Sequence, residues 1–190
     1  GDQPRHLGSA NRASEKWVNG VLGGTASHPR CLTDPPSVRE QGTGYRQELM
    51  IEIDPERLLK DLSTLRSFGA VGNGVVRTAF SDIDMASRRW LAEQLANADL
   101  KASVDGVGNV IATTEECSRS LLIGSHSDTQ PTGGWLDGAL GVIYGLEIAR
   151  SYSEAGRLPG IGIDVVSWMD EEGTYFSSLG SRSFCGEFTD

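Results

Sequence analysis

The chain has 190 residues and a formal net charge of −9, from 26 acidic and 17 basic side chains. This length suits one domain, or one domain with a tail. The acidic balance argues against nucleic acid or an anionic membrane as a partner. The three cysteines lie far apart and form no Cys-x-x-Cys pair, so neither a disulfide framework nor a thiolate zinc site is indicated. We therefore expect a cytoplasmic protein without a membrane partner.

Residues 1–48 differ in composition from the rest of the chain. They hold four of the seven prolines, and their apolar residues occur only as short islands. Such a segment can bury little apolar surface, so we expect a poorly ordered extension. His6 and His28 fall within it and are interpreted as solvated side chains rather than as metal ligands.

A globular pattern begins at about residue 49 and opens with two predicted helices. Asp54 and Pro55 predict the start of the first helix, with Asp54 as its cap and proline at its first position. Ser81 opens the second helix at the spacing of a capping box. The apolar residues expected on the buried faces of the two helices are Leu58, Leu59, Leu62, Leu65, Ile83, Trp90, Leu91 and Leu95.

The second half of this region alternates strands and a helix. Residues 100–104 and 107–113 predict a hairpin around a turn at Asp105-Gly106. Residues 121–124 form a short apolar run ended by glycine, which is typical of a buried strand. Apolar residues then recur at helical spacing from Gly138 onward, and residues 161–169 form a second apolar strand. A strand, a helix and a strand of these lengths predict a right-handed crossover with parallel strands.

Polar side chains follow both strands of this crossover. His126 and Asp128 come after the first strand, Asp137 stands where the helix begins, and Glu171 and Glu172 follow the second strand. The carboxyl ends of parallel strands meet at one sheet edge, where open α/β sheets bind ligands. Taken singly, these residues have ordinary explanations: a polar loop, a helix cap and a solvated turn. Brought together, the carboxylates would repel one another unless a cation lay between them.

A divalent metal is the simplest such cation. Imidazole and carboxylate ligands suit zinc, manganese or cobalt. The stretch Gly-Ser-His126-Ser-Asp128-Thr-Gln-Pro-Thr-Gly-Gly-Trp-Leu-Asp137-Gly resembles the first metal-binding motif of the hydantoinase/carbamoylase amidases, within the group of M20-type metallopeptidases. Asp-Glu171-Glu172-Gly, with Gly-Ser-Arg after it, resembles their second motif, and the resemblance covers residues 53–186. It implies an α/β fold, a three-layer catalytic domain with a mostly parallel mixed sheet, incomplete in this chain.

The resemblance also implies a role for each residue of the site. It implies two divalent metal ions (Zn²⁺, Mn²⁺ or Co²⁺), with His126 on one ion, Asp137 bridging both and Glu172 on the second. Glu171 is implied as the general base for the attacking water. Asp128 is implied to orient His126 by hydrogen bonding, which agrees with the general need of a ligating imidazole for a partner on its other nitrogen.

The implied reaction is hydrolysis of a linear non-peptide amide, most specifically an N-carbamoyl-L-amino acid or a related ureido acid. Gln130 is a candidate contact to this small-molecule substrate. The family places two further histidines and a lid and dimerisation domain after the part that this chain resembles. We therefore expect residues 49–190 to be the N-terminal part of a dimetal catalytic domain, inactive by itself, and the full-length protein to be a homodimer.

Three alternatives remain open at this point. An aminoacylase or dipeptidase of the same larger group would use a similar site, although the stretch around Gln130 favours the carbamoylase branch. A non-catalytic fragment could retain only the fold. The glycines of residues 133–141 could form a phosphate-binding loop, but they lack the Gly-Lys-Ser/Thr ending of a P-loop.

Overall fold

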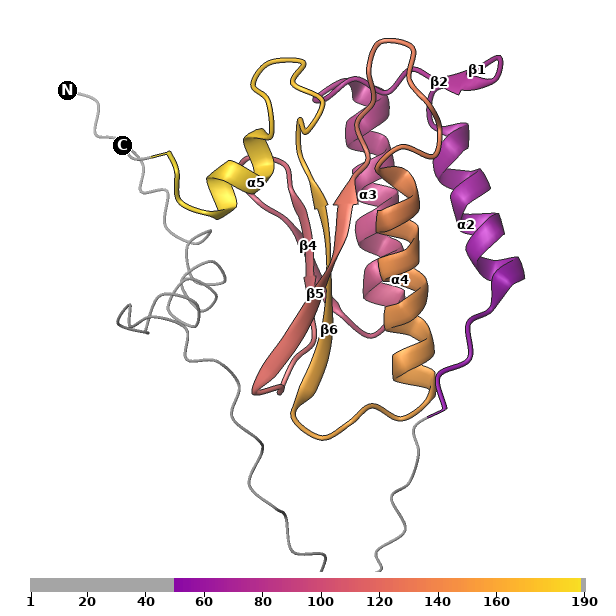
Figure 1. Cartoon of the computed structure of the whole chain (residues 1–190), viewed down its shortest axis with the longest axis vertical. Helices are drawn as coiled ribbons and strands as arrows, with labels where there is room; N and C mark the ends of the chain where they lie inside the picture. Colours follow the sequence, from indigo (N-terminus) through magenta and orange to yellow (C-terminus); the bar gives the residue numbers. More distant parts are fainter. Residues whose placement is uncertain (1–49, 189–190) are drawn as a thin grey trace, which may run out of the picture. The chain divides into compact units, whose positions relative to one another are not determined.

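The structure, a computed structural model, describes residues 50–188 (Figure 1). The predicted extension of residues 1–48, with its two histidines, lies outside the described residues. No helix among residues 50–188 combines the length and the apolar character that crossing a membrane requires.

A mixed four-stranded sheet in the order β3-β4-β6-β5 forms the centre of the described region. Its strands are β3 (Lys101–Val104), β4 (Val110–Thr113), β5 (Arg119–His126) and β6 (Ile161–Trp168). β5 and β6 are parallel, whereas the β3-β4 and β4-β6 pairs are antiparallel. A separate two-stranded hairpin consists of β1 (Ala70–Val71) and β2 (Gly74–Val75). The α/β class with a mixed sheet and a parallel crossover is confirmed.

Helices α2 (Pro55–Ser67), α3 (Asp82–Asn97) and α4 (Ala139–Glu154) lie on one side of the sheet in Figure 1. The short α5 (Leu179–Phe184) follows β6 and packs near its end, where Trp168 and Phe184 stack. Between the three long helices and the sheet lies the apolar core. Its fully buried members include Leu65, Leu91, Leu95, Val110, Val142, Ile143, Leu146 and Val165.

Both predicted helix starts are confirmed by their caps. The Asp54 carboxylate accepts hydrogen bonds from the backbone N–H groups of Glu56 and Arg57, which satisfies donors that the first helical turn leaves free. The Ser81 hydroxyl accepts from the N–H of Asp84 in the same way. The predicted buried stripes were too wide, because Leu59 is 59% exposed and Ile83 is 44% exposed. Only a narrow face of each helix packs on the core, and these two side chains lie outside that face.

The expectation that glycine ends the strand of residues 121–124 was wrong. β5 continues to His126, and Gly124 lies inside it. A Cβ atom at Gly124 would lie 1.9 Å from the backbone oxygen of Val166, so glycine is needed here for the close approach of β6. β5 is an edge strand of the described sheet, which explains why Leu121 is 60% exposed rather than buried.

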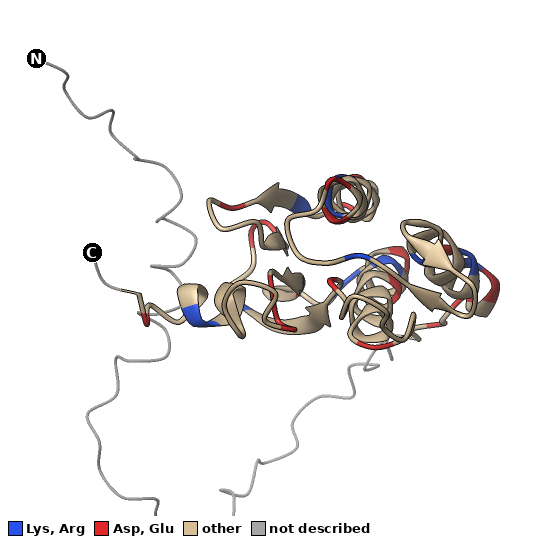
Figure 2. Ribbon diagram, turned by 90° about the horizontal axis from the view of Figure 1, so that it is seen from above, with Lys and Arg blue, Asp and Glu red and all other residues tan. Residues whose placement is uncertain are grey.

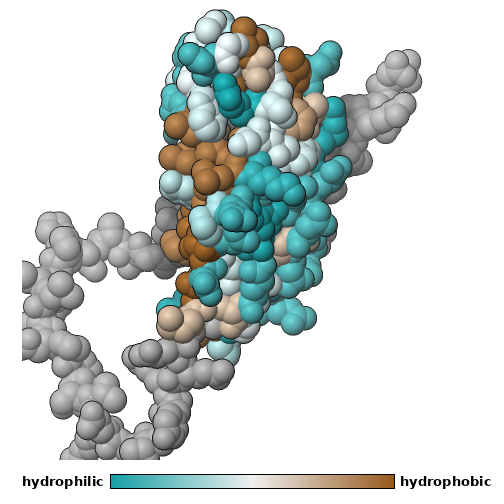
Figure 3. All heavy atoms as spheres, turned by 90° about the vertical axis from the view of Figure 1, so that its right-hand side faces the viewer, coloured by the Kyte–Doolittle hydropathy of each residue, from teal (hydrophilic) through white to brown (hydrophobic). Residues whose placement is uncertain are grey.

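β6 is paired on both sides, which agrees with its nearly continuous apolar sequence. The open edges of the sheet formed by residues 50–188 are therefore β3 and β5. Large apolar side chains remain exposed near the β5 side and on the helices, among them Leu59, Leu121 and Tyr144. Figure 3 shows an apolar strip beside a hydrophilic area on one face of the molecule.

A partly buried ion pair joins α2 to α4. Glu147 is 1% exposed, and its carboxylate accepts from the guanidinium of Arg57 at 2.8 and 2.9 Å and from the N–H of Asp54 at 2.9 Å. Burial by itself raises the pKa of Glu147, but the hydrogen bonds from Arg57 and from the Asp54 N–H outweigh it and hold the pKa below its usual range. The charged form of Glu147 therefore stabilises the folded state.

We predict that Glu147→Gln lowers the free energy of unfolding at pH 7 by about 1.5–3 kcal/mol, the range for hydrogen bonds to a charged group. Because folding lowers the pKa of Glu147, its contribution is present above the unfolded value of roughly 4.3 and is lost as the pH falls through the folded value. The free energy of unfolding, measured in urea from pH 7 to pH 3, should thus fall less on acidification in the variant than in the wild type. Glu93→Gln, at an exposed position of α3, is the matched control and should change neither quantity.

Candidate metal centre

The parallel pairing of β5 with β6 brings the predicted site together. The register places His126 opposite Trp168, so the residues after both strands leave the sheet at the same edge. Figure 2 looks down on this edge and shows acidic segments, in red, among the loops and helix ends around it. The edge is therefore the place where the predicted ligands can meet.

The imidazole of His126 is held in one orientation. The ring is buried, and its Nδ1 lies 3.0 Å from the backbone oxygen of Asp128. Because a carbonyl oxygen only accepts, a neutral ring carries its proton on Nδ1 and leaves a lone pair on Nε2. Nε2 lies 3.5 Å from Oε2 of Glu171. The nitrogen that is free to bind a metal thus faces the acidic loop.

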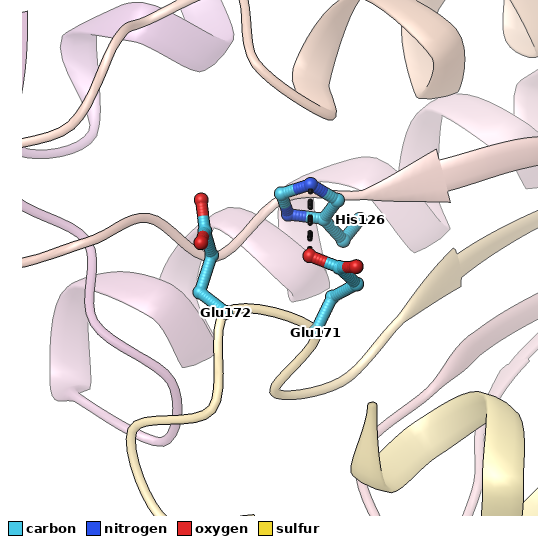
Figure 4. Close-up of side chains that lie close together, drawn as sticks. All are labelled: His126, Glu171 and Glu172. Atoms are coloured by element: carbon cyan, nitrogen blue, oxygen red, sulfur yellow. Dashed lines mark ion pairs between the residues drawn. The ribbon is translucent and has the colours of Figure 1, made fainter. Parts of the chain in front are cut away.

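His126, Glu171 and Glu172 form a group whose ligand atoms all lie within 4.8 Å of one another. Figure 4 shows the imidazole at the end of β5 facing both carboxylates, which come from the loop after β6. Two half-buried carboxylates beside one imidazole suit zinc, manganese or cobalt, and a divalent cation would remove their mutual repulsion. The donor set therefore fits the metal that the sequence predicts.

Asp170 shapes the loop that carries the two glutamates, and sequence reasoning gave it no role. It is fully buried with a left-handed φ of 53°, and its carboxylate accepts from the backbone N–H groups of Thr174, Tyr175 and Phe176 at 2.7, 3.0 and 2.7 Å. These bonds fold the chain back on itself directly after the glutamates. An aspartate followed closely by glycine is a known turn signal and could have indicated this role.

Gln130 and Asp128 both contact Glu172. The side-chain amide of Gln130 donates to the Glu172 carboxylate at 2.6 Å, and the Glu172 N–H donates to Oδ2 of Asp128 at 3.1 Å. The carboxylate of Asp128 lies 3.7 Å from Nδ1 of His126, and Nδ1 donates its hydrogen bond to the Asp128 backbone oxygen instead. A substrate contact by Gln130 stays a prediction.

Asp137 lies outside the group of three ligands and is exposed at the start of α4. It does not cap the helix, because the cap position belongs to Gly138 and carries no side-chain hydrogen bond. The N–H of Ala139 bonds to the backbone oxygen of Asp137 across Gly138, whose φ of 63° and ψ of −49° describe a γ-turn. A metal-bridging role for Asp137 stays a prediction.

Gly138 is a further residue of the site that sequence reasoning missed. A Cβ atom at this position would lie 2.4 Å from Nε2 of His126, and φ is in the left-handed region. Glycine is therefore required both by the turn and by the close approach to the nitrogen that faces the acidic loop. The Asp-Gly dipeptide before the helix was the available sequence signal.

We predict that Gly138→Ala weakens the binding of Co²⁺ by the chain at least about tenfold, because the new methyl group displaces the imidazole from the two carboxylates. Isothermal titration calorimetry measures the affinity, and circular dichroism checks that the fold is retained. Gly134→Ala is the control, since its Cβ would meet only the Cβ of Asp137, at 4.0 Å. An unchanged affinity in Gly138→Ala would contradict this account of His126.

Known proteins resemble the chain in the region that contains this site. A sequence model described as peptidase family M28 matches residues 109–189. N-carbamoyl-L-amino-acid amidohydrolase of Rhizobium meliloti is 36% identical over 143 residues, which cover 72% of this chain and 34% of that protein. Ureidoglycolate hydrolase of rice is 32% identical over 140 residues, which cover 70% of this chain and 29% of that protein.

Solved structures show the same relationship. The crystal structure of a hydantoinase/carbamoylase family amidase from Burkholderia phymatum is 61% identical and superposes with a TM-score of 0.66, covering 70% of this chain and 33% of that one. The chain thus spans about a third of the relatives that it matches. In sequence and in fold, over about 70% of its length, it belongs to the hydantoinase/carbamoylase family of amidases.

Proposed function

We propose that the chain carries part of the metal centre of an amidohydrolase that cleaves the ureido group of an N-carbamoyl-L-amino acid or a related ureido acid. The observation that carries this proposal is the arrangement of His126, Glu171 and Glu172, whose ligand atoms lie within 4.8 Å of one another at the edge where β5 and β6 end. The names of the relatives support the substrate class, because N-carbamoyl amino acids and ureidoglycolate share a ureido group.

Three residues would hold two divalent ions in this proposal: His126 on one, Glu172 on the other, and Asp137 between them. When bound, such ions acidify water and polarise the substrate carbonyl. Glu172 suits a ligand because its carboxylate and its backbone N–H are both fixed, by Gln130 and Asp128. The remaining ligands and the dimer would come from parts of the family fold outside these residues.

Glu171 is the proposed general base. Its side chain is 43% exposed, and its Oε2 lies 3.5 Å from Nε2 of His126, so it reaches both the centre and solvent. It would take a proton from the attacking water while the water oxygen bonds to the ureido carbon. It would then deliver the proton to the departing nitrogen as the C–N bond breaks.

We predict opposite effects for the two glutamates. Glu171→Gln should leave metal affinity within about threefold and lower turnover by roughly two to four orders of magnitude, the range for loss of a general base. Glu172→Gln should mainly weaken metal binding, by about 10–100-fold. Metal affinity is measured on this chain, and turnover on a protein in which the rest of the family fold follows it. Reversed behaviour of the two variants would exchange their roles.

The substrate class is tested by comparing hydrolysis of an N-carbamoyl-L-amino acid, ureidoglycolate, an N-acetyl amino acid and a dipeptide by that longer protein. Preference for the ureido compounds supports the proposal, whereas preference for the acetylated amino acid or the dipeptide favours the aminoacylase or dipeptidase alternative.

We also predict that the 190-residue chain by itself is inactive and prone to aggregate. The open edge of β5 and exposed side chains such as Leu121 and Tyr144 offer surface for non-specific association. Size-exclusion chromatography and the ureido assay check this expectation. A monodisperse chain that hydrolyses ureido acids would show that these residues suffice for function.

A further inference from the structure

A buried arginine lies directly behind the metal centre. The side chain of Arg88 on α3 has no exposed surface. Its Nε donates to both carboxylate oxygens of Asp84 at 3.0 Å, and its Nη atoms donate to the backbone oxygens of Gly108, Ser167 and Trp168 at 3.3, 3.3 and 3.1 Å. Arg88 thus connects α3 to the end of β6, the strand that leads into Glu171 and Glu172.

The same guanidinium faces Asp128. Its Nη2 lies 3.5 Å from Oδ1 of Asp128, and this carboxylate is fully buried. Within residues 50–188, Oδ1 of Asp128 has no hydrogen-bond partner, while Oδ2 accepts from the N–H of Glu172. A buried carboxylate oxygen without a hydrogen bond is costly unless a cation lies beside it, and the neighbouring cation is Arg88.

Arg77 is the second fully buried arginine of this region, and it serves a different purpose. Its side chain donates to the backbone oxygens of Ser127, Leu65 and Phe68. Unlike Arg88, it therefore forms its hydrogen bonds with the backbone and not with carboxylates. Burial lowers the pKa of Arg77 to about 10, which still leaves it charged at neutral pH. Arg88 is therefore the arginine that pairs with the carboxylates of Asp84 and Asp128, while no arginine or lysine among residues 50–188 forms an ion pair with Glu171 or Glu172.

We propose that Arg88 is a positioning residue of the metal centre that acts through Asp128. By attracting the carboxylate of Asp128, Arg88 fixes the residue whose backbone oxygen orients His126 and whose Oδ2 holds the N–H of Glu172. This inference rests on the proposed metal centre and adds a residue from α3 to it. Without the cation, the Asp128 carboxylate turns toward Nδ1 of His126, which lies 3.7 Å away, and both ligands lose their alignment.

The test uses the full chain and Co²⁺ as the probe, read by calorimetry and by the visible absorption of the bound ion. Arg88→Met alone would leave Asp84 buried and unpaired, so it is combined with Asp84→Asn, which keeps the net charge. The matched control is Asp61→Asn with Arg150→Met, which removes an ion pair between α2 and α4. The Arg88→Met, Asp84→Asn change is also made in an Asp128→Asn background, which completes a double-mutant cycle.

We expect the Arg88→Met, Asp84→Asn variant to bind Co²⁺ about 10–100-fold more weakly with a shifted absorption band. The control should keep the affinity and spectrum of the wild type. In the Asp128→Asn background, the same change should lower the Co²⁺ affinity by less than about threefold, because the residue through which Arg88 acts has already been altered. If the variant does not fold, Arg88→Lys is tested in its place. One ammonium group cannot reach Asp84, the β6 carbonyls and Asp128 together, so the Co²⁺ absorption band of this variant should also shift.

Wild-type affinity and spectrum in a folded Arg88 variant would overturn the proposal. An equal loss of affinity with and without Asp128 would do the same, since Arg88 would then act on the fold and not through Asp128. If neither the unaltered chain nor a protein in which the rest of the family fold follows it bound Co²⁺, the proposed metal centre itself would fail, and this inference with it. The behaviour of the unaltered proteins therefore separates the two failures.

Discussion

The parallel pairing of β5 with β6 is the constraint on which the site depends. A parallel register that places His126 beside Trp168 makes both strands end at one edge, so an imidazole and two carboxylates distant in sequence become neighbours. The crossover through α4 makes this pairing possible. Gly124 lets β5 approach β6, and Gly145 lets α4 approach β6, because a Cβ on either would meet β6 at 3.0 Å or less. Changing this register would separate the ligands even if every side chain were retained.

The electrostatics of the edge explain why a cation belongs there. The chain as a whole is acidic, with a formal charge of −9. Inside the protein, Arg88 pairs with the carboxylates of Asp84 and Asp128, while Glu171 and Glu172 lie beside the imidazole of His126 and form no ion pair with an arginine or lysine of residues 50–188. Two carboxylates held close together without a counter-charge are unfavourable, and a divalent ion removes that cost. The same repulsion between carboxylates that destabilises the loop therefore favours the binding of a metal there.

Much of this arrangement could be predicted from the sequence, because it depends on local signals. Caps and proline placement identified the starts of α2 and α3, and apolar patterns identified the crossover. The errors arose where tertiary contacts overrule local pattern. Gly124 continues a strand because β6 lies against it, and Leu59 lies outside the helix face that packs on the core. The role of Arg88 depends on partners that only the folded chain brings near, and no local spacing reveals it.

The residues of the candidate centre come from one supersecondary unit, which has a consequence for folding. His126 ends β5, Gly138 precedes α4, and Glu171 and Glu172 follow β6, so a metal bound by these ligands would link the two strands of the crossover. The carboxylate of Asp170 fixes the loop after β6, and the guanidinium of Arg88 donates to the last carbonyl of β6. An ion bound there would stabilise the parallel β5-β6 pair, whose outer strand, β5, has an open edge among the described residues. Metal binding at the proposed centre would therefore be coupled to the stability of this sheet edge, because the ends of the two paired strands would supply the ligands.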